Sequence, residues 1–507
     1  MRGREARARD RAAPPDAAEG LPDALRQRSA ASSGAAALSG RLTLSGRDDR
    51  RSAGSAGAAG LSALAVAEWA EDAAPDASAR SEDAPDGLSG VLSGRLSDGL
   101  ATRLFAAALA GPQRTLLRDS GDRVAWCGRP SITWTYAAAA EIVGRLARGI
   151  AAWRLPAGSR IGLWYSGGAE SALAHLAVEA AGHLPCAMPA LWDEAELSAG
   201  IEAAGLVAVL TEGRRGARRP DEDLTRAAMR HFALRYLAAF GPSVPDGVIS
   251  LDARTLERGV LEPAPGRGLV TFAGGDPGRP VYRTAAALAA AVAAHLDALP
   301  LTADERVLTL LPGHDLRGLV TGLGTALAAG AGLETVLPFD ETGFRAALLR
   351  PVPTRLVVPA RVESALAALP LPWTVRVLDV VHRAPARLTP RGAGPAGPQR
   401  LDSLVLGEAL VLTRPGPDDL AATLAEPGQA FLPRDLLDLA AGADGDLACR
   451  GAACAASPLT RGAIPATDPL AWRSTGFRPL RADGRADGGA NGAVAAIAAT
   501  VATVPSA

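Results

Sequence analysis

The chain has 507 residues, of which 48% are hydrophobic and 21% charged, and its formal net charge is −1. Its length is about three times the ~150 residues of a typical domain, and the composition is that of an ordinary globular protein. The near-neutral charge gives no electrostatic reason to expect nucleic acid or an anionic membrane as a partner. All 53 basic residues are arginines, which excludes Schiff-base chemistry and any lysine-dependent phosphate loop or adenylation.

The cysteines and the apolar runs exclude further classes. Four cysteines without zinc-ligand spacing predict neither a disulfide framework nor a zinc site. The apolar runs 285–294 and 494–504 are shorter than the ~20 residues that cross a bilayer. The first thirty residues carry Arg and Asp and lack the apolar segment of a signal peptide. We therefore expect a cytoplasmic protein without a membrane or nucleic-acid partner.

Residues 1–95 predict a disordered, low-complexity arm. They consist mainly of Ala, Gly, Ser, Arg, Asp and Pro, and the tetrapeptide Leu-Ser-Gly-Arg recurs at 38–41, 44–47 and 92–95. Such a segment has too little large apolar surface to offset the entropy of ordering it.

From residue 96 onward, helical and strand patterns alternate, which favours α/β layers with mostly parallel strands. We expect an α/β core over 96–385, a β-rich remainder of the same domain over 386–485, and a loose tail over 486–507. The expected helices are 101–109, 137–153, 169–181, 285–299, 318–329 and 343–349, and the expected strands are 160–165, 206–210, 268–272, 306–311, 334–337 and 355–358.

Six stretches, in order, resemble one family. They include "LPAGSRIGLWY" (155–165), "LTADERVLTLLPGHDLRGLVTGLGTALAAGAG" (301–332) and "WRSTGFRPLRADG" (472–484). Together they resemble the large N-terminal domain of the adenylate-forming, or AMP-binding, superfamily, which contains acyl-CoA synthetases, luciferase-like enzymes and peptide-synthetase adenylation domains. The resemblance covers about 96–485 and implies two α/β subdomains plus a small β-rich subdomain, preceded by the disordered arm. The other three stretches are 132–153, 170–190 and 446–451.

The family's phosphate loop, Tyr-Thr-Ser-Gly-Thr-Thr-Gly-x-Pro-Lys-Gly, surrounds the ATP phosphates with hydroxyls, N–H groups and a lysine. Here the aligned residues 272–282 read FAGGDPGRPVY. All three hydroxyls are missing, Val281 takes the lysine position, and Pro277 has no N–H to donate. Asp276 places a carboxylate where the polyphosphate would lie. The cofactor-binding residues that remain in this degenerate loop are Gly274, Gly275, Gly278 and Arg279.

Further family positions also differ. Arg279 or Arg283 offers a replacement cation, since arginine binds phosphate well. Phe477 stands where the family has the ribose-binding Asp, and a phenyl ring accepts no hydrogen bond from a hydroxyl. Glu408 is the nearest remnant of the family's magnesium-binding Glu; we predict an exposed loop residue rather than this metal ligand. The family continues into a lid with a catalytic lysine, whereas this sequence ends at Ala507.

The acyl side of the resemblance keeps its residues. His314 aligns with the Pro-x-x-His block that borders the family's acyl pocket, and both a pocket residue and a loop residue remain open. Gly318 and Gly322 follow as candidate pocket residues on a predicted helix, where each glycine costs about 1 kcal/mol relative to Ala. Close backbone packing, a ligand channel or a coding bias toward Gly would explain them. His175 falls within a predicted helix, and we interpret it as a surface or core histidine.

Two functions follow from the resemblance. The first is a degenerate, AMP-dependent acyl-CoA synthetase-like protein without ATP-dependent acyl-adenylate formation, which acts as a binding or regulatory protein or is a remnant. The second is an active acyl- or aryl-acid-activating ligase with a rebuilt phosphate loop and a lid supplied by a partner. The expected ligand is a small apolar carboxylate or an acyl thioester. ATP with Mg²⁺, and CoA, are expected as cofactors only for the second function.

Overall fold

The computed structural model describes residues 99–367, 369–388, 397–428, 436–442, 445–460, 464–481 and 494–500. All of them belong to the second of the two units into which the chain divides, Arg80–Ala507. The predicted arm, 1–95, lies outside the described residues.

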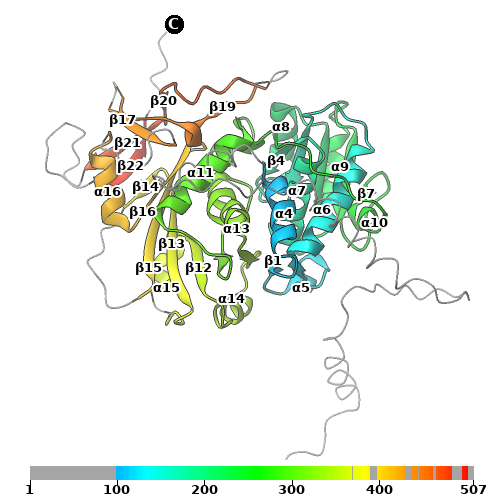
Figure 1. Cartoon of the computed structure of the whole chain (residues 1–507). Coiled ribbons are helices and arrows are strands. Elements are labelled where there is room, and N and C mark those ends of the chain that lie inside the picture. The colour runs from blue at the N-terminus through cyan, green and yellow to red at the C-terminus, as the bar shows by residue number, and fades with distance from the viewer. Residues whose placement is uncertain are drawn as a thin grey trace, which may run out of the picture. The chain divides into compact units, whose positions relative to one another are not determined.

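Two sheets, each of eight strands within the described ranges, form the two α/β subdomains (Figure 1). Most neighbouring strands are parallel, as the alternation of helices and strands predicts. Sheet A is ordered β16-β15-β13-β12-β10-β11-β1-β2, and sheet B is ordered β19-β9-β8-β4-β3-β5-β6-β7. The strands of sheet A are β1 (Thr115–Asp119), β2 (Thr133–Thr135), β10 (Arg306–Thr309), β11 (Gly332–Thr335), β12 (Thr354–Pro359), β13 (Val375–Arg383), β15 (Gln399–Leu406) and β16 (Leu410–Arg414). Those of sheet B are β3 (Arg160–Trp164), β4 (Leu184–Met188), β5 (Ala208–Glu212), β6 (Tyr236–Phe240), β7 (Ile249–Ser250), β8 (Leu269–Phe272), β9 (Pro280–Arg283) and β19 (Ala456–Pro458).

Helices surround these sheets. The helices are α4 (Leu100–Ala110), α5 (Arg123–Cys127), α6 (Tyr136–Ala151), α7 (Ala169–Ala180), α8 (Glu194–Ala204), α9 (Pro220–Ala228), α10 (Leu251–Thr255), α11 (Ala285–Ala298), α12 (Leu316–Gly318), the π-helix η3 (Leu319–Gly324), α13 (Thr325–Ala329), α14 (Glu341–Leu348), α15 (Glu363–Leu366) and α16 (Pro417–Ala425). The predicted helices agree with observed ones to within two residues at each end, except at 318–329, which divides into three pieces, and α8, α9 and α16 were not predicted. Within the described ranges, no helix has both the length and the apolar character needed to cross a membrane.

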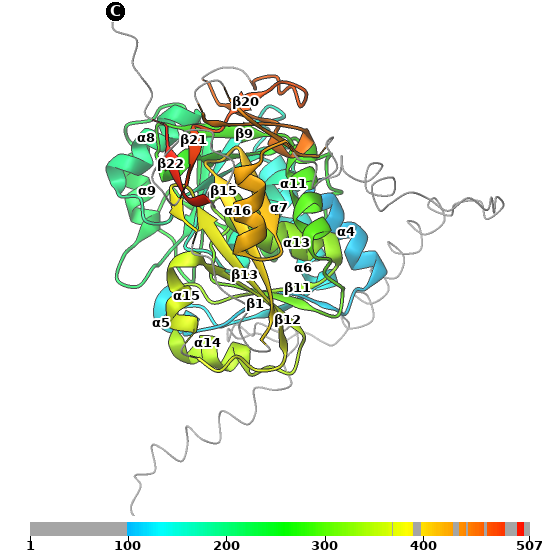
Figure 2. The same ribbon diagram turned by 90° about the vertical axis from the view of Figure 1, so that its left-hand side faces the viewer.

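Each sheet buries both faces because successive side chains of a strand point to opposite sides. In sheet A, Val307 joins the large apolar cluster shared with α11 and the π-helix η3, whereas Leu308 joins the cluster under α14 and α15. Figure 2 shows α14 and α15 together at one end of this sheet, with α11 and α13 on the side of α4 and α6. In sheet B, Leu163 faces α6 and α7, and Trp164 faces α8 and α9. The helices α4, α6, α7, α11 and α13 thus form the layer between the sheets.

Two boundaries differ from those predicted from composition. The strands β15 and β16 lie beyond residue 385 and still complete sheet A, so the α/β part extends past that residue. The expected loose tail contains β22 (Val494–Ala499), the middle strand of a small sheet with β14 (Ala386–Arg387) and β21 (Phe477–Arg481). Val494 and Ile497 are buried in this sheet, and their burial orders a segment that its Ala-rich composition does not mark. A second small sheet contains β17 (Asp438–Ala441), β18 (Leu447–Arg450) and β20 (Arg473–Ser474).

A buried carboxyl group joins α4 to α7. Glu179 accepts hydrogen bonds from the N–H groups of Leu100 (3.1 Å) and Ala101 (3.0 Å), which lie at the N-terminus of α4. Gly99 has no side-chain cap of its own, and a Cβ there would lie 2.0 Å from the Glu179 carboxylate. Burial raises the pKa of Glu179 to about 7. The Glu179 carboxylate, 79 positions after Leu100, therefore caps α4.

The raised pKa of Glu179 predicts a pH-dependent stability. A carboxyl that titrates at 4.5 when unfolded and at about 7 when folded binds its proton more tightly in the folded chain. Stability should therefore fall as the pH rises through this window, by up to about 3 kcal/mol. Glu179→Gln removes this titration, so the variant should gain stability relative to the parent between pH 5 and 7.5. Urea denaturation of the parent and of the variant at pH 5 and at pH 7.5 measures the difference between their free energies of unfolding. A difference that is the same at both pH values would contradict the argument that burial raises the pKa of Glu179.

Candidate functional site

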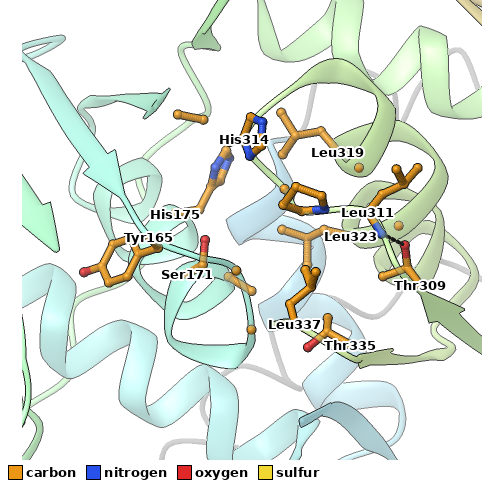
Figure 3. A pocket seen from close by; sticks show the side chains of 18 of the residues that line it. Tyr165, Ser171, His175, Thr309, Leu311, His314, Leu319, Leu323, Thr335 and Leu337 are labelled. Atoms are coloured by element: carbon orange, nitrogen blue, oxygen red, sulfur yellow. Dashed lines mark hydrogen bonds between the residues drawn. The ribbon is translucent and has the colours of Figure 1, made fainter. Parts of the chain in front are cut away.

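A cleft opens between the two sheets, where α7 from one subdomain faces the π-helix η3 from the other (Figure 3). It lies beyond the carboxyl ends of β3, β10 and β11, where α/β sheets commonly hold ligands. Among the residues that the structure describes, the lining is mainly apolar and contains no Asp, Glu or Arg side chain. Its larger apolar side chains are Leu163, Leu311, Leu319, Leu323, Leu333 and Leu337.

The glycines of the π-helical segment have two different roles. A Cβ on Gly318 would lie 2.0 Å from the Pro312 carbonyl oxygen, and one on Gly324 would lie 2.5 Å from Val292 Cγ2. These two glycines therefore permit close packing. Gly322 has no such neighbour, since its nearest atom would be 3.9 Å away, and it lies along the wall of the cleft.

Two histidines project into the cleft from its two sides. His314, on the loop after β10, points toward the space that His175 enters from α7 (Figure 3). Burial lowers the pKa of His314, and it lowers the pKa of His175 to about 4, so both imidazoles are neutral at pH 7. His314 and Gly318, expected from the sequence, thus line the same cleft as Gly322. His175 is a core histidine, as interpreted from the sequence, but its place in this lining was not predicted.

The degenerate phosphate loop forms the turn of the β8–β9 hairpin. Gly274 and Gly275 have φ values of 72° and 79°, a region that only glycine adopts readily. The indole N–H of Trp192 donates to the Gly275 carbonyl (2.8 Å) and holds the turn against α8. The glycine pattern therefore has a conformational reason in this chain that does not require a nucleotide.

Three N–H groups of this loop have partners within the loop itself. Gly278 donates to the Asp276 carboxylate (2.8 Å), Asp276 donates to the Ala273 carbonyl (3.2 Å), and Arg279 donates to the Asp276 carbonyl (3.1 Å). Pro277 has no N–H. The loop thus directs these three donors to its own carboxylate and carbonyls, and the Asp276 carboxylate among them does not fit a triphosphate.

The two candidate cations of the loop are in opposite environments. Arg283 is buried, and its guanidinium donates to the carbonyls of Ala453 (2.6 Å), Glu408 (2.6 Å) and Ala409 (3.0 Å). Arg279 is exposed, and within the described part of the chain its side chain has no hydrogen-bond or ion-pair partner. Arg283 therefore holds the structure together and is not a replacement for the phosphate-binding lysine; Arg279 alone is free for that role.

Glu408 is buried, so the expectation of an exposed loop residue is wrong. It lies in the turn between β15 and β16, is 4% exposed, and accepts a hydrogen bond from the Leu316 N–H (3.1 Å). Burial, followed by the neighbouring Asp315 carboxylate, raises the pKa of Glu408 to about 7. Burial alone would also raise the pKa of Asp315, but nearby positive charges, among them Arg317 and Arg383, lower it below its usual value. Asp315 is therefore the more acidic member of the pair.

Phe477 packs into the β-rich part of the fold. It begins β21 and lies against the apolar cluster formed by β15, β16 and α16. The preceding Thr475 hydroxyl donates to the Leu447 carbonyl (2.8 Å) and accepts from the Phe477 N–H (3.3 Å). These contacts are internal to the fold, and the Phe477 side chain offers no acceptor for a ribose hydroxyl.

Comparisons with known proteins agree with this architecture. Residues 113–350 match the family model of AMP-binding enzymes. A comparison with curated protein sequences found no significant match. Residues 113–350 are thus similar to AMP-binding enzymes, as the sequence motifs predicted.

Solved structures of adenylate-forming enzymes share the fold. The apo structure of MbtA from Mycobacterium smegmatis has a TM-score of 0.57 at 20% identity, and the match covers 82% of this chain and 79% of that chain. A mutant of the amide bond synthetase Mcba from Marinactinospora thermotolerans gives 0.56 at 17% identity, covering 76% and 77%. The o-succinylbenzoate coenzyme A synthetase MenE from Bacillus subtilis, in complex with ATP and magnesium, gives 0.53 at 14%, covering 69% and 88%. The predicted fold, two α/β subdomains with a small β-rich part, is confirmed.

Arg283 and Arg279 give a matched test of the different roles assigned to them, one structural and one exposed. Arg283→Met leaves three carbonyls without a donor in the core, which should lower the free energy of unfolding by about 3 kcal/mol or more. Arg279→Met removes an exposed side chain and should change stability by less than about 0.5 kcal/mol. Urea denaturation of the two variants measures the contrast. Equal effects would show that Arg283 does not tie the hairpin to its neighbours.

Proposed function

We propose that this protein is a degenerate member of its family that binds a small carboxylic acid or an acyl thioester in the cleft and does not form acyl-adenylates. The observation that carries the proposal is the hydrogen bond from the Gly278 N–H to the Asp276 carboxylate. An anion nest acts through N–H groups that point at the ligand. Here a carboxylate of the loop itself takes this position and repels a polyphosphate.

Two further contacts support the loss of nucleotide chemistry. The guanidinium of Arg283 donates its hydrogen bonds to backbone carbonyls. Phe477, which stands where the family has a ribose-binding carboxylate, packs against an apolar cluster. The cleft itself keeps a mainly apolar lining with a few polar side chains, which is the usual character of a small-molecule site. Binding of an acid without its activation suits a binding or regulatory role.

One observation favours an active acyl- or aryl-acid-activating ligase as the second candidate. Glu408 is buried beside Asp315, and Arg279 is exposed at the phosphate loop. A ligase with a rebuilt loop would use Arg279 as its phosphate-binding cation and Glu408 with Asp315 as oxygen ligands for magnesium. Mg·ATP and CoA belong to this second candidate only.

Pyrophosphate exchange separates the two candidates. Removal of one well-placed donor from a catalytic site costs about 10²–10³ in rate, and several of the family's phosphate-binding groups are replaced here. Exchange with a panel of fatty and aromatic acids should therefore remain at background. Robust exchange with any acid that Arg279→Ala abolishes would establish the ligase, and Glu408→Gln would then report on the metal site.

Thermal denaturation shows which ligand the cleft binds. A ligand at 100 times its dissociation constant stabilises the native state by about 2.7 kcal/mol, enough to raise the melting temperature of a domain this large by about one degree or more. We expect a suitable carboxylic acid or acyl thioester to raise the melting temperature and millimolar Mg·ATP to leave it unchanged. A rise with Mg·ATP alone would refute the proposed loss of the nucleotide site.

A further inference from the structure

The α7 side of the cleft carries polar groups that no protein group satisfies. Ser171 and His175 lie one turn apart on α7, and His175 is only 4% exposed. In the described ranges, neither side chain has a hydrogen-bond partner. The Nδ1 atom of His314 is likewise buried and without a partner among these residues. In Figure 3, the dashed bond between residues of the lining joins Leu311 to Thr309, away from these three side chains.

Buried polar groups without a partner are costly, at about 1–3 kcal/mol each. The Nδ1 atom of His314 is such a group, and it lines the same largely leucine-walled cavity as the side chains of His175, which is buried, and Ser171, which is half-buried. A ligand that brings its own hydrogen-bonding group to this wall recovers that cost, and a pure hydrocarbon does not. The cleft therefore distinguishes ligands by whether their chain or ring carries a polar group.

The charge of this wall defines the group further. His175 and His314 are neutral at pH 7 because burial lowers both pKa values, and no Arg, Asp or Glu lines the cleft. The neighbouring cations are already paired: Arg317 and Arg383 with Asp315, and Arg123, beside Gly168, with Asp119 and Glu170. An ionised group placed against α7 would be desolvated without a counter-charge. A hydroxyl or a carbonyl fits, since a neutral imidazole offers one donor and one acceptor and Ser171 offers both.

We propose that Ser171 and His175 form a specificity site for an uncharged hydrogen-bonding group, a hydroxyl or a carbonyl, on the body of the bound acid. The preferred ligand is then a hydroxy- or oxo-substituted carboxylic acid rather than an unsubstituted fatty or aromatic acid. This inference rests on the proposed function, because it assigns the chemical class of the acid that the cleft binds.

The test compares acids that differ by one oxygen, on the full-length chain. Isothermal titration with octanoate and 8-hydroxyoctanoate, and with 3-phenylpropionate and its ring-hydroxylated forms, gives a ratio of dissociation constants for each pair. We expect the hydroxylated member of at least one pair to bind about tenfold or more tightly, the effect of about 1.4 kcal/mol. His175→Phe keeps a ring of similar shape and should reduce this ratio to within about twofold, while the unsubstituted acid binds as well as before.

Matched variants separate recognition from a general structural effect. His231→Phe removes a histidine that hydrogen-bonds Ser198 outside the cleft, and it should keep the parent ratio. Ser171→Ala should lower the ratio in part. A purely structural role for His175 would weaken both acids of a pair equally and leave the ratio unchanged, and thermal denaturation without ligand checks that each variant folds.

Each outcome of these titrations either supports or contradicts the inference. If acids bind without preference for the oxygenated member, or if the preference survives in both His175→Phe and Ser171→Ala, this inference is wrong and the proposed acid binding stands. If no acid of either kind binds, both the inference and the proposed function fail.

Discussion

The buried guanidinium of Arg283 is the contact on which the arrangement of the phosphate-loop side depends. It lies at the end of β9 and donates to the carbonyls of Ala453, Glu408 and Ala409. Three segments distant in the sequence are thereby fixed to one another: the β8–β9 hairpin, the turn between β15 and β16, and the 3-10 turn before β19. Since arginine remains charged in proteins, its burial requires such a set of acceptors. The same requirement removes Arg283 from any exchange with a phosphate and keeps Glu408 inside the fold.

The two sides of the domain have different chemistry. In the β8–β9 turn, donors that could bind an anion are bonded within the turn, as in the bond from Gly278 to Asp276. On the acid side, polar groups of the cleft remain available, with His175 and His314 both neutral and facing the same space. The proposed function follows from this contrast, because a protein that binds an acid needs only the second side. The buried Glu408–Asp315 pair lies near both sides, next to the loop that carries His314.

Much of the fold was predictable because its signals are local. The Ala-rich helix expected at 285–299 is α11 (Ala285–Ala298), and the strand expected at 160–165 is β3 (Arg160–Trp164). Periodicity identifies such elements because one residue in two of a strand, or a stripe of a helix, must be apolar to be buried. The family motifs then supplied the order of the elements, while they left His314 open between a pocket residue and a loop residue. Composition changes near residue 385, whereas sheet A continues beyond it through β15 and β16.

The sequence by itself determined the alternation of helices and strands, the absence of lysine, the altered phosphate loop with Asp276, and Phe477 in place of a carboxylate. Only the tertiary structure decided the rest: that Glu408 is buried, that Arg283 is structural while Arg279 is exposed, and that His175 faces the cleft. The physical reason is the range of the interactions. Backbone propensity and side-chain periodicity depend on near neighbours along the chain. The burial of a polar side chain depends on partners such as Ala453 for Arg283, which lies 170 residues away, and no local pattern specifies them.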